Sequence, residues 1–203
     1  GGCTITPHLI LLQSPLPDIT DSLEIDGYSE PETAANTLDT GSDAVLCIVI
    51  ASQSAVLPQA LQVPQGAPAG TSLTVKGIAF AGSTGFNGNF TVAVRLRGGS
   101  DHVIQGNAFA GTGPGAIGPL GTLFFGLQIR NEAQNVLVGG ADPEHRNSFG
   151  AMDSSAIVLN HLARRHRPPP PEVLPTAPTL HLPPVADCAR YDTLRGERRH
   201  GEA

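Results

Sequence analysis

Planar hydrogen-bond donors recur along this 203-residue chain at a near-constant step. Gln62, Arg95 and Gln128 each stand at the centre of an apolar–polar–apolar triplet, and successive triplets begin 33 residues apart. Arg97 and Arg130 follow two residues after the second and third of these positions. Guanidinium and amide groups present planar donors that suit carboxylate and hydroxyl groups. We therefore name Gln62, Arg95, Arg97, Gln128 and Arg130 as candidate binding residues for a polysaccharide, above all an acidic one.

The carboxylates do not gather in a comparable way. Asp101 lies just after an expected strand, and Asp142, Glu144 and Asp153 fall in or near one later loop. Calcium needs about six to eight converging oxygen ligands, and glycoside hydrolysis needs two carboxyl groups at a set separation. Ordinary loop carboxylates account for these four residues more simply, and a surface position accounts for the lone His145. We therefore assign no catalytic residue, no metal ligand and no cofactor.

The elements that would position the donors are short strands in a repeat. The triplets occupy residues 61–63, 94–96, 127–129 and 157–159, with starts separated by 33, 33 and 30 residues. A second pattern, apolar-x-Gly, ends at Gly77, Gly106 and Gly139, and one phenylalanine follows in each of these repeats: Phe80, Phe109 and Phe149. Self-similarity at a fixed period, in strand-sized segments without intervening helices, predicts an all-β solenoid.

Side-chain alternation along each strand specifies how the repeats would stack. Leu61, Val94, Leu127 and Ile157 should point inward and lie above one another, with Leu159 and its counterparts beside them. Upstream of the repeats, we expect a buried strand at 9–12, early copies of the second and third strands at 23–27 and 45–50, and an excursion at 28–44. The recurring glycines should mark a bend with positive φ or tight stacking.

Composition limits the classes of partner. Twelve Lys and Arg residues and a formal charge of −6 argue against nucleic acid, and no run of 18 apolar residues is present to span a membrane. Three cysteines are too few for a disulfide framework or a zinc site, so Cys47 is interpreted as a small buried hydrophobe. We expect a β-helix domain at 1–160 and a disordered tail at 161–203, which holds eight prolines and a basic cluster.

Several segments resemble a known group of proteins. Residues 16–29, LPDITDSLEIDGYS, resemble the opening of bacterial right-handed parallel β-helix repeat proteins in the pectin-lyase-like superfamily. The strings HVIQGNAF at 102–109 and NVLVGG at 135–140 are similar to coils of the same proteins. The resemblance covers about residues 9–160 and implies a right-handed parallel β-helix of about four to five rungs.

The resemblance implies a location and two classes of function. It implies an extracellular or cell-surface bacterial protein, and the start without methionine suggests part of a larger polypeptide. We favour a non-catalytic module that serves as a scaffold or as an adhesion and polysaccharide-binding surface. The alternative is a partial or degenerate polysaccharide lyase or glycoside hydrolase that acts on acidic polysaccharide, because such enzymes share the superfamily and fold alone does not determine function.

Overall fold

The computed structural model describes residues 7–52, 56–82, 89–112, 119–160 and 180–181. This part of the chain forms three parallel sheets, a short antiparallel pair and two single-turn 3-10 helices, η1 (Gly27–Ser29) and η3 (Pro143–His145). The first sheet contains, in spatial order, β15 (Met152–Asn160), β12 (Leu123–Arg130), β7 (Asn89–Leu96) and β4 (Val56–Val63). The second contains β16 (Leu180–His181), β13 (Gln134–Val138), β8 (Ser100–Gln105), β5 (Leu73–Lys76) and β2 (Leu23–Asp26).

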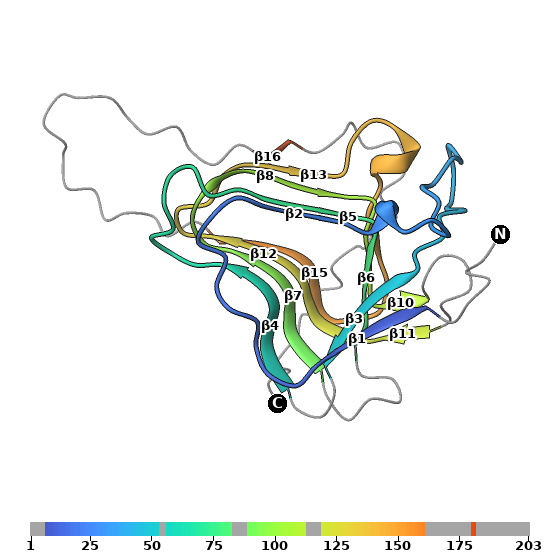
Figure 1. The fold of residues 1–203 in the computed structure, drawn as a ribbon, viewed down its shortest axis with the longest axis horizontal. Coiled ribbons are helices and arrows are strands. Elements are labelled where there is room, and N and C mark those ends of the chain that lie inside the picture. The colour runs from blue at the N-terminus through green and yellow to red at the C-terminus, as the bar shows by residue number, and fades with distance from the viewer. Residues whose placement is uncertain (1–6, 53–55, 83–88, 113–118, 161–179, 182–203) are drawn as a thin grey trace, which may run out of the picture.

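The third sheet contains β1 (His8–Leu12), β3 (Ile48–Ser52), β6 (Ile78–Phe80), β9 (Ala108–Phe109) and β14 (Ser148–Phe149). The antiparallel pair is β10 (Gly111–Thr112) with β11 (Pro119–Gly121). The chain visits the three sheets in a fixed order, so that β4–β5–β6, β7–β8–β9 and β12–β13–β14 form successive coils (Figure 1). Three coils are thus complete within the described residues, and the arrangement is compatible with the predicted parallel β-solenoid.

The strand register confirms the predicted stacking of the triplets. Leu61 is paired with Val94, Val94 with Leu127, and Leu127 with Ile157. The first three of these side chains are buried in one hydrophobic core, so each coil stabilises the next by burying aliphatic surface. Leu159, which was expected beside them in the interior, is 56% exposed. It lies on β15, the last strand of the first sheet, and no described strand pairs with the outer edge of β15.

The recurring phenylalanines form a second internal stack. The rings of Phe80 and Phe109 lie 5.1 Å apart with an interplanar angle of 10°, and those of Phe109 and Phe149 lie 4.7 Å apart at 4°. This stack stands in the third sheet, where the three residues occupy equivalent positions in successive coils. The glycines at the preceding corner have φ values between 64 and 75°, as their recurrence predicted: Gly77, Gly106 and Gly139.

The prediction for the first strand was wrong in one respect. Residues 8–12 do form a strand, β1, which pairs with β3. However, Leu9, Ile10 and Leu11 are 43, 46 and 37% exposed instead of buried. The reason is position, since β1 is the edge strand of the third sheet and no described strand pairs with its other side.

Cys47 differs from its interpretation as a plain buried hydrophobe. Its side chain is buried, as predicted, but it is also disulfide-bonded. The other two cysteines, Cys3 and Cys188, lie outside the described residues. The tail predicted for 161–203 also lies outside them, apart from the two residues of β16.

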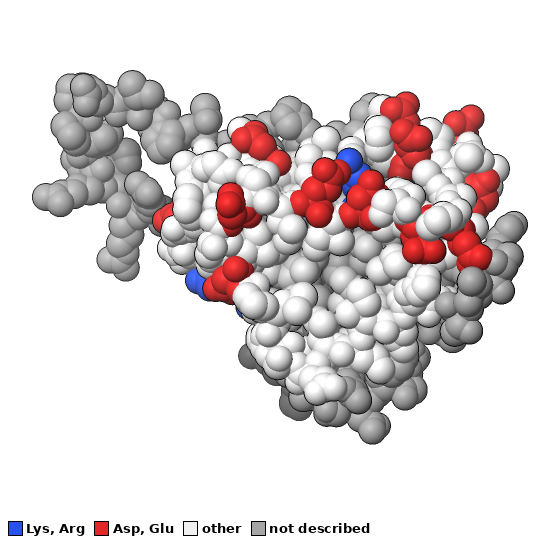
Figure 2. All heavy atoms as spheres, in the orientation of Figure 1, with Lys and Arg blue, Asp and Glu red and all other residues white. Residues whose placement is uncertain are grey.

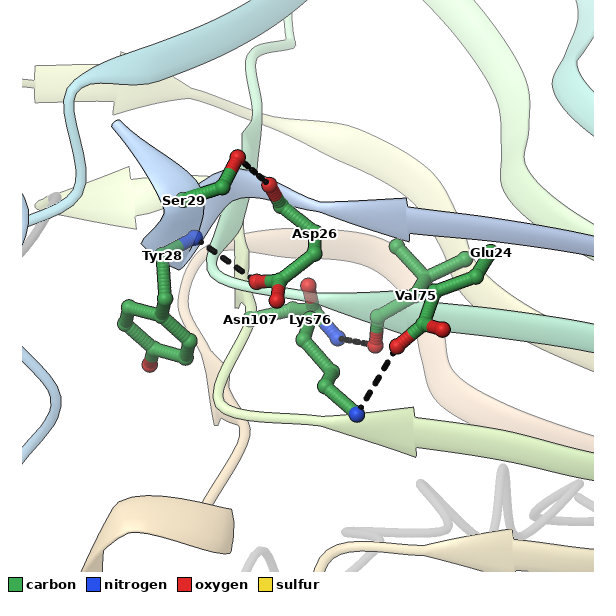
Figure 3. A network of polar contacts seen from close by, with 7 residues as sticks. All are labelled: Glu24, Asp26, Tyr28, Ser29, Val75, Lys76 and Asn107. Atoms are coloured by element: carbon green, nitrogen blue, oxygen red, sulfur yellow. Dashed lines mark hydrogen bonds and ion pairs between the residues drawn. The ribbon is translucent and has the colours of Figure 1, made fainter.

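Two asparagine amides close the corner between the second and third sheets. Asn107 accepts a hydrogen bond from the Ile78 N–H at 3.0 Å through Oδ1 and donates through Nδ2 to the Val75 carbonyl at 2.9 Å, a bond drawn in Figure 3. Asn147, one coil later, donates through Nδ2 to the Ile104 carbonyl at 2.7 Å. The Oδ1 atom of Asn147 also accepts from the Asn107 backbone N–H at 3.0 Å. These amides satisfy backbone groups at the corner that the parallel ladders leave unpaired.

His102 also satisfies buried backbone groups, at the turn between the first and second sheets. Its fully buried ring accepts a hydrogen bond from the Leu73 N–H at Nδ1 (3.0 Å), so Nε2 carries the proton and donates to the Gly98 carbonyl (2.9 Å). Burial lowers the pKa of His102 below its ordinary value of 6.5, against smaller opposing effects of the Gly98 hydrogen bond and the Asp101 charge. The folded protein therefore holds this ring neutral.

The neutral ring predicts a pH-dependent stability. As the pH falls below about 6.5, the unfolded chain binds a proton at residue 102 before the folded chain does, so the free energy of unfolding should decline toward the lowered pKa. Urea unfolding between about pH 7.5 and pH 5 measures this slope. A His102→Gln variant should be less stable throughout but show a flatter pH dependence. Equal slopes for the two proteins would rule out His102 as the source.

Candidate functional site

The predicted row of donors is aligned by the first sheet. Gln62 of β4 is paired with Arg95 of β7, and Arg95 with Gln128 of β12. Arg130, at the end of β12, is paired with Asn160 of β15. The parallel register therefore places equivalent residues of successive coils side by side, about 4.8 Å apart.

Three of the five predicted residues line one surface pocket. The pocket has a volume of about 430 Å³, and we call it the arginine pocket. Its lining consists of three arginines and three uncharged polar residues: Arg95, Arg97, Arg130, Gln65, Asn131 and Asn160. Since no acidic residue is among them, the pocket concentrates positive charge without an internal counter-charge.

Arg95 is the fixed member of the cluster. It donates to Gln59 Oε1 through Nη1 at 2.9 Å, to the Pro58 carbonyl through Nη2 at 3.2 Å, and to Gln128 Oε1 through Nε at 3.3 Å. Burial lowers the pKa of Arg95, and the charges of Arg130 and Arg97 lower it further. A guanidinium stays protonated despite such shifts. Arg95 therefore supplies a positive charge that is held in place, because each of its three nitrogens donates one hydrogen bond within the protein.

Arg97 and Arg130 have side-chain N–H groups without a hydrogen-bond partner among the described residues. Arg97 donates one bond, from Nη2 to Gln65 Oε1 at 3.2 Å, and Asn131 donates to the same oxygen at 2.8 Å. The Nε of Arg130 is buried and has no hydrogen-bond partner in the described part of the chain. A buried donor without a partner costs about 1–3 kcal/mol. Because this atom is shielded from solvent, the Nη groups of Arg97 and Arg130 are the donors that an anion in the pocket would meet.

Charge is segregated between this pocket and the start of the chain. Residues 7–43 carry eight acidic side chains and no Lys or Arg. Figure 2 shows acidic groups in a band across the upper part of one face, where Figure 1 places β2, β5 and the excursion. Of the five Lys and Arg residues between positions 7 and 160, three line the arginine pocket. The positive potential of the pocket is therefore local and not a property of the whole surface.

The two predicted glutamines have other roles. Gln62 does not line the pocket, because its Nε2 donates to Asp18 Oδ1 at 2.7 Å. The segment around Ile19 runs beside β4, where the Ile19 N–H donates to the Gln62 carbonyl, and it brings Asp18 to this glutamine. Gln128 is 2% exposed and supports Arg95. The five predicted residues thus fall into two groups. Gln62 and Gln128 bond to other side chains of the protein, and the three arginines line the arginine pocket.

Sequence reasoning missed two lining residues. Gln65 and Asn131 lie in turns just after β4 and β12, outside the strand pattern that identified the arginines. Asn131 has a positive φ of 56°, a conformation in which asparagine is common. Their position immediately after a repeated strand is the signal that would have found them.

The loop carboxylates lie elsewhere. Asp142 Oδ2 is 3.6 Å from His145 Nδ1, and Glu144 Oε1 is 3.5 Å from His145 Nε2. Asp101 accepts a hydrogen bond from Asn135 at 3.2 Å. Within the described ranges, no group of three or more His, Cys, Asp or Glu side chains is placed to hold a metal ion. The same ranges contain no helix of the length and apolarity that a membrane span requires.

Comparison with known proteins gives no relative. No protein-family model matches this chain, and no curated protein or solved structure matches it. Membership of the pectin-lyase-like superfamily therefore stays a prediction from the segments quoted above. The function is inferred from the strand arrangement and from the arginine pocket.

Proposed function

We propose that this protein is a non-catalytic β-helix module that binds an acidic polysaccharide through the arginine pocket. The observation that carries the proposal is a pocket with three arginines and no acid, in which Arg97 makes one side-chain hydrogen bond and Arg130 makes none within the described residues. A carboxylate can accept from the two Nη groups of one guanidinium in the bidentate geometry that arginine prefers. The charge of Arg95 adds attraction without needing direct contact.

A linear polymer fits the site better than a single small anion. Arg97 and Arg130 belong to adjacent coils, and Asn160 continues the row on the next strand. A chain that lies along the axis of the coils would pass these three residues in turn. Such a chain gains avidity when its carboxylates recur along its length, because each additional contact is intramolecular.

The location and the finer fold belong to the same proposal. Disulfides persist in oxidising compartments such as the exterior of the cell, and the disulfide at Cys47 supports an extracellular or cell-surface location. A right-handed winding is proposed because crossover connections between parallel strands of one sheet are right-handed in nearly all proteins. Both features agree with the bacterial β-helix proteins that the sequence resembles, in which the module would form part of a larger polypeptide.

Binding to polygalacturonate tests the proposal. The parent protein should be retarded in affinity electrophoresis through this polymer, and the Arg97→Ala/Arg130→Ala double variant should lose about tenfold or more in affinity. Arg146→Ala is the matched control, because Arg146 lies outside the pocket and donates to the Leu38 carbonyl. Arg130→Lys keeps the charge but not the planar donor, so it should recover part of the loss at most.

Two results would contradict the proposal. One is absence of binding by the parent protein, and the other is equal retardation of the double variant and the Arg146→Ala control. Dextran, which is uncharged, should bind neither protein. A separate incubation of the protein with polygalacturonate, with and without calcium, checks for unsaturated sugar products. Their calcium-dependent release would instead support the polysaccharide lyase alternative.

A further inference from the structure

A second pocket lies at the corner between the second and third sheets, and we call it the corner pocket. Its volume is about 380 Å³. Its lining comes from three separate segments, namely the excursion, the second sheet and the η3 turn: Tyr28 and Thr33, Lys76 and Gln105, and Glu144 and His145. The arginine pocket follows the ends of the first-sheet strands, so the two pockets lie at opposite ends of the second sheet.

The walls of the corner pocket are fixed by contacts over long sequence separations. The Tyr28 hydroxyl donates to the Gly106 carbonyl at 2.8 Å, and the Gly106 N–H donates to the His145 carbonyl at 3.2 Å. Asn36, which is buried, donates to the Pro143 carbonyl at 3.1 Å. The excursion and the η3 turn are thus held against the same corner. A pocket that is formed before binding loses less entropy when a ligand enters.

Lys76 and Gln105 lie side by side on the floor of the pocket, and Asp26 lies next to Lys76 just outside the lining. Asp26, Lys76 and Gln105 occupy equivalent positions on β2, β5 and β8, which places them at intervals of about 4.8 Å. Figure 3 shows Asp26, Lys76 and Tyr28 at this corner. Gln105 Nε2 donates to the Gly139 carbonyl at 2.9 Å, while no described group donates to its Oε1. This oxygen is left as an acceptor for a ligand.

The lysine of the corner pocket is already paired. The Lys76 ammonium lies 3.0 Å from Glu24 Oε1 (Figure 3), and the Glu144 carboxylate lies 3.5 Å from His145 Nε2. Burial, with Asp26 and Glu144, raises the pKa of Tyr28 to about 12, so its ring remains a neutral phenol. The pocket therefore offers an uncharged aromatic wall and a floor that can both donate and accept.

We infer that the corner pocket binds a small uncharged ring that bears several hydroxyl groups, such as one sugar unit or a cyclic polyol. Each hydroxyl both donates and accepts, which matches a Lys76 donor beside the Gln105 Oε1 acceptor. The apolar face of such a ring can pack against Tyr28. An anionic ligand would have to compete with Glu24 for Lys76 and would meet the negative charge of Glu144, so the pocket discriminates against it.

Titration of the ¹⁵N-labelled protein tests this inference. The probes are myo-inositol and the methyl glycosides of glucose, galactose and xylose. At least one should produce saturable shifts of the Gly106 and His145 amides, with a Kd of about 1–10 mM. Gln105→Leu should weaken this binding about fivefold or more, and Lys76→Met provides a second variant if the first does not fold. Gln134→Leu, at the other end of the second sheet, is the matched control.

The outcomes separate this inference from the polysaccharide proposal. The Arg97→Ala/Arg130→Ala variant should bind the neutral probes as the parent protein does, because neither arginine lines the corner pocket. Absence of saturable shifts for all four probes up to about 100 mM would overturn the inference. So would shifts that are the same in the parent protein and in folded Gln105→Leu and Lys76→Met variants.

Discussion

Replacing Asn107 with alanine should lower the free energy of unfolding by about 2–6 kcal/mol, because two buried backbone groups lose their partners at about 1–3 kcal/mol each. The side chain satisfies the Ile78 N–H and the Val75 carbonyl, and both bonds lie in the interior. The Nδ2 of Asn107 also donates to Asn147 Oδ1 at 3.2 Å. The substitution would therefore weaken the corner in two successive coils at once.

Urea unfolding of the parent protein and the variant measures the loss. Asn160→Ala is the matched control, because Asn160 is exposed on β15 and has no side-chain hydrogen bond within the described residues. That change should alter stability by less than about 0.5 kcal/mol. If both variants unfold at the same urea concentration, the amide of Asn107 does not hold the corner as described.

Replacing Gly106 should be at least as damaging. Its φ of 64° is unfavourable for any residue with a Cβ, at a cost of about 1–2 kcal/mol. A Cβ would also meet the Tyr28 hydroxyl oxygen and lie 2.9 Å from the Glu144 carbonyl oxygen. We expect Gly106→Ala to lose about 3 kcal/mol or more, and Gly106→Val to prevent stable folding, because a larger side chain must displace Tyr28.

Gly41 provides a control that isolates the second cause. Its φ of 79° is similarly unfavourable, but a Cβ there would meet nothing within 4 Å. Gly41→Ala should therefore cost the conformational penalty alone, about 1–2 kcal/mol. Thermal unfolding followed by circular dichroism compares the two alanine variants. Equal melting temperatures would show that the close approach of Tyr28 to Gly106 has no energetic consequence.

The sequence was sufficient to predict the repeated strands and their register. Leu61, Val94 and Leu127 could be aligned before any coordinates because a stacked coil returns the chain to the same place after each repeat. The same reasoning placed Arg95 beside Gln128. In such a fold, residues that are one repeat apart in the sequence are neighbours in the core. The repeated phenylalanines were predictable for the same reason.

Contacts made by segments outside the repeat could not be predicted in this way. Asp18 reaches Gln62 across 44 residues, and Tyr28 reaches Gly106 across 78. Neither Asp18 nor Tyr28 stands at a position of the repeat, so no spacing in the sequence connects these residues with Gln62 and Gly106.

The sequence by itself determined which residues stack, because hydrophobic side chains at a fixed period bury most surface when they lie over one another. Tertiary structure alone decided which donors remain free. Asp18 accepts from the Gln62 amide and Gln128 is buried as an acceptor for Arg95, whereas Arg130 has no side-chain partner within the described residues. The physical reason is that hydrogen bonds act over short distances between particular atoms, and the packing of non-repeating loops and edges sets those distances.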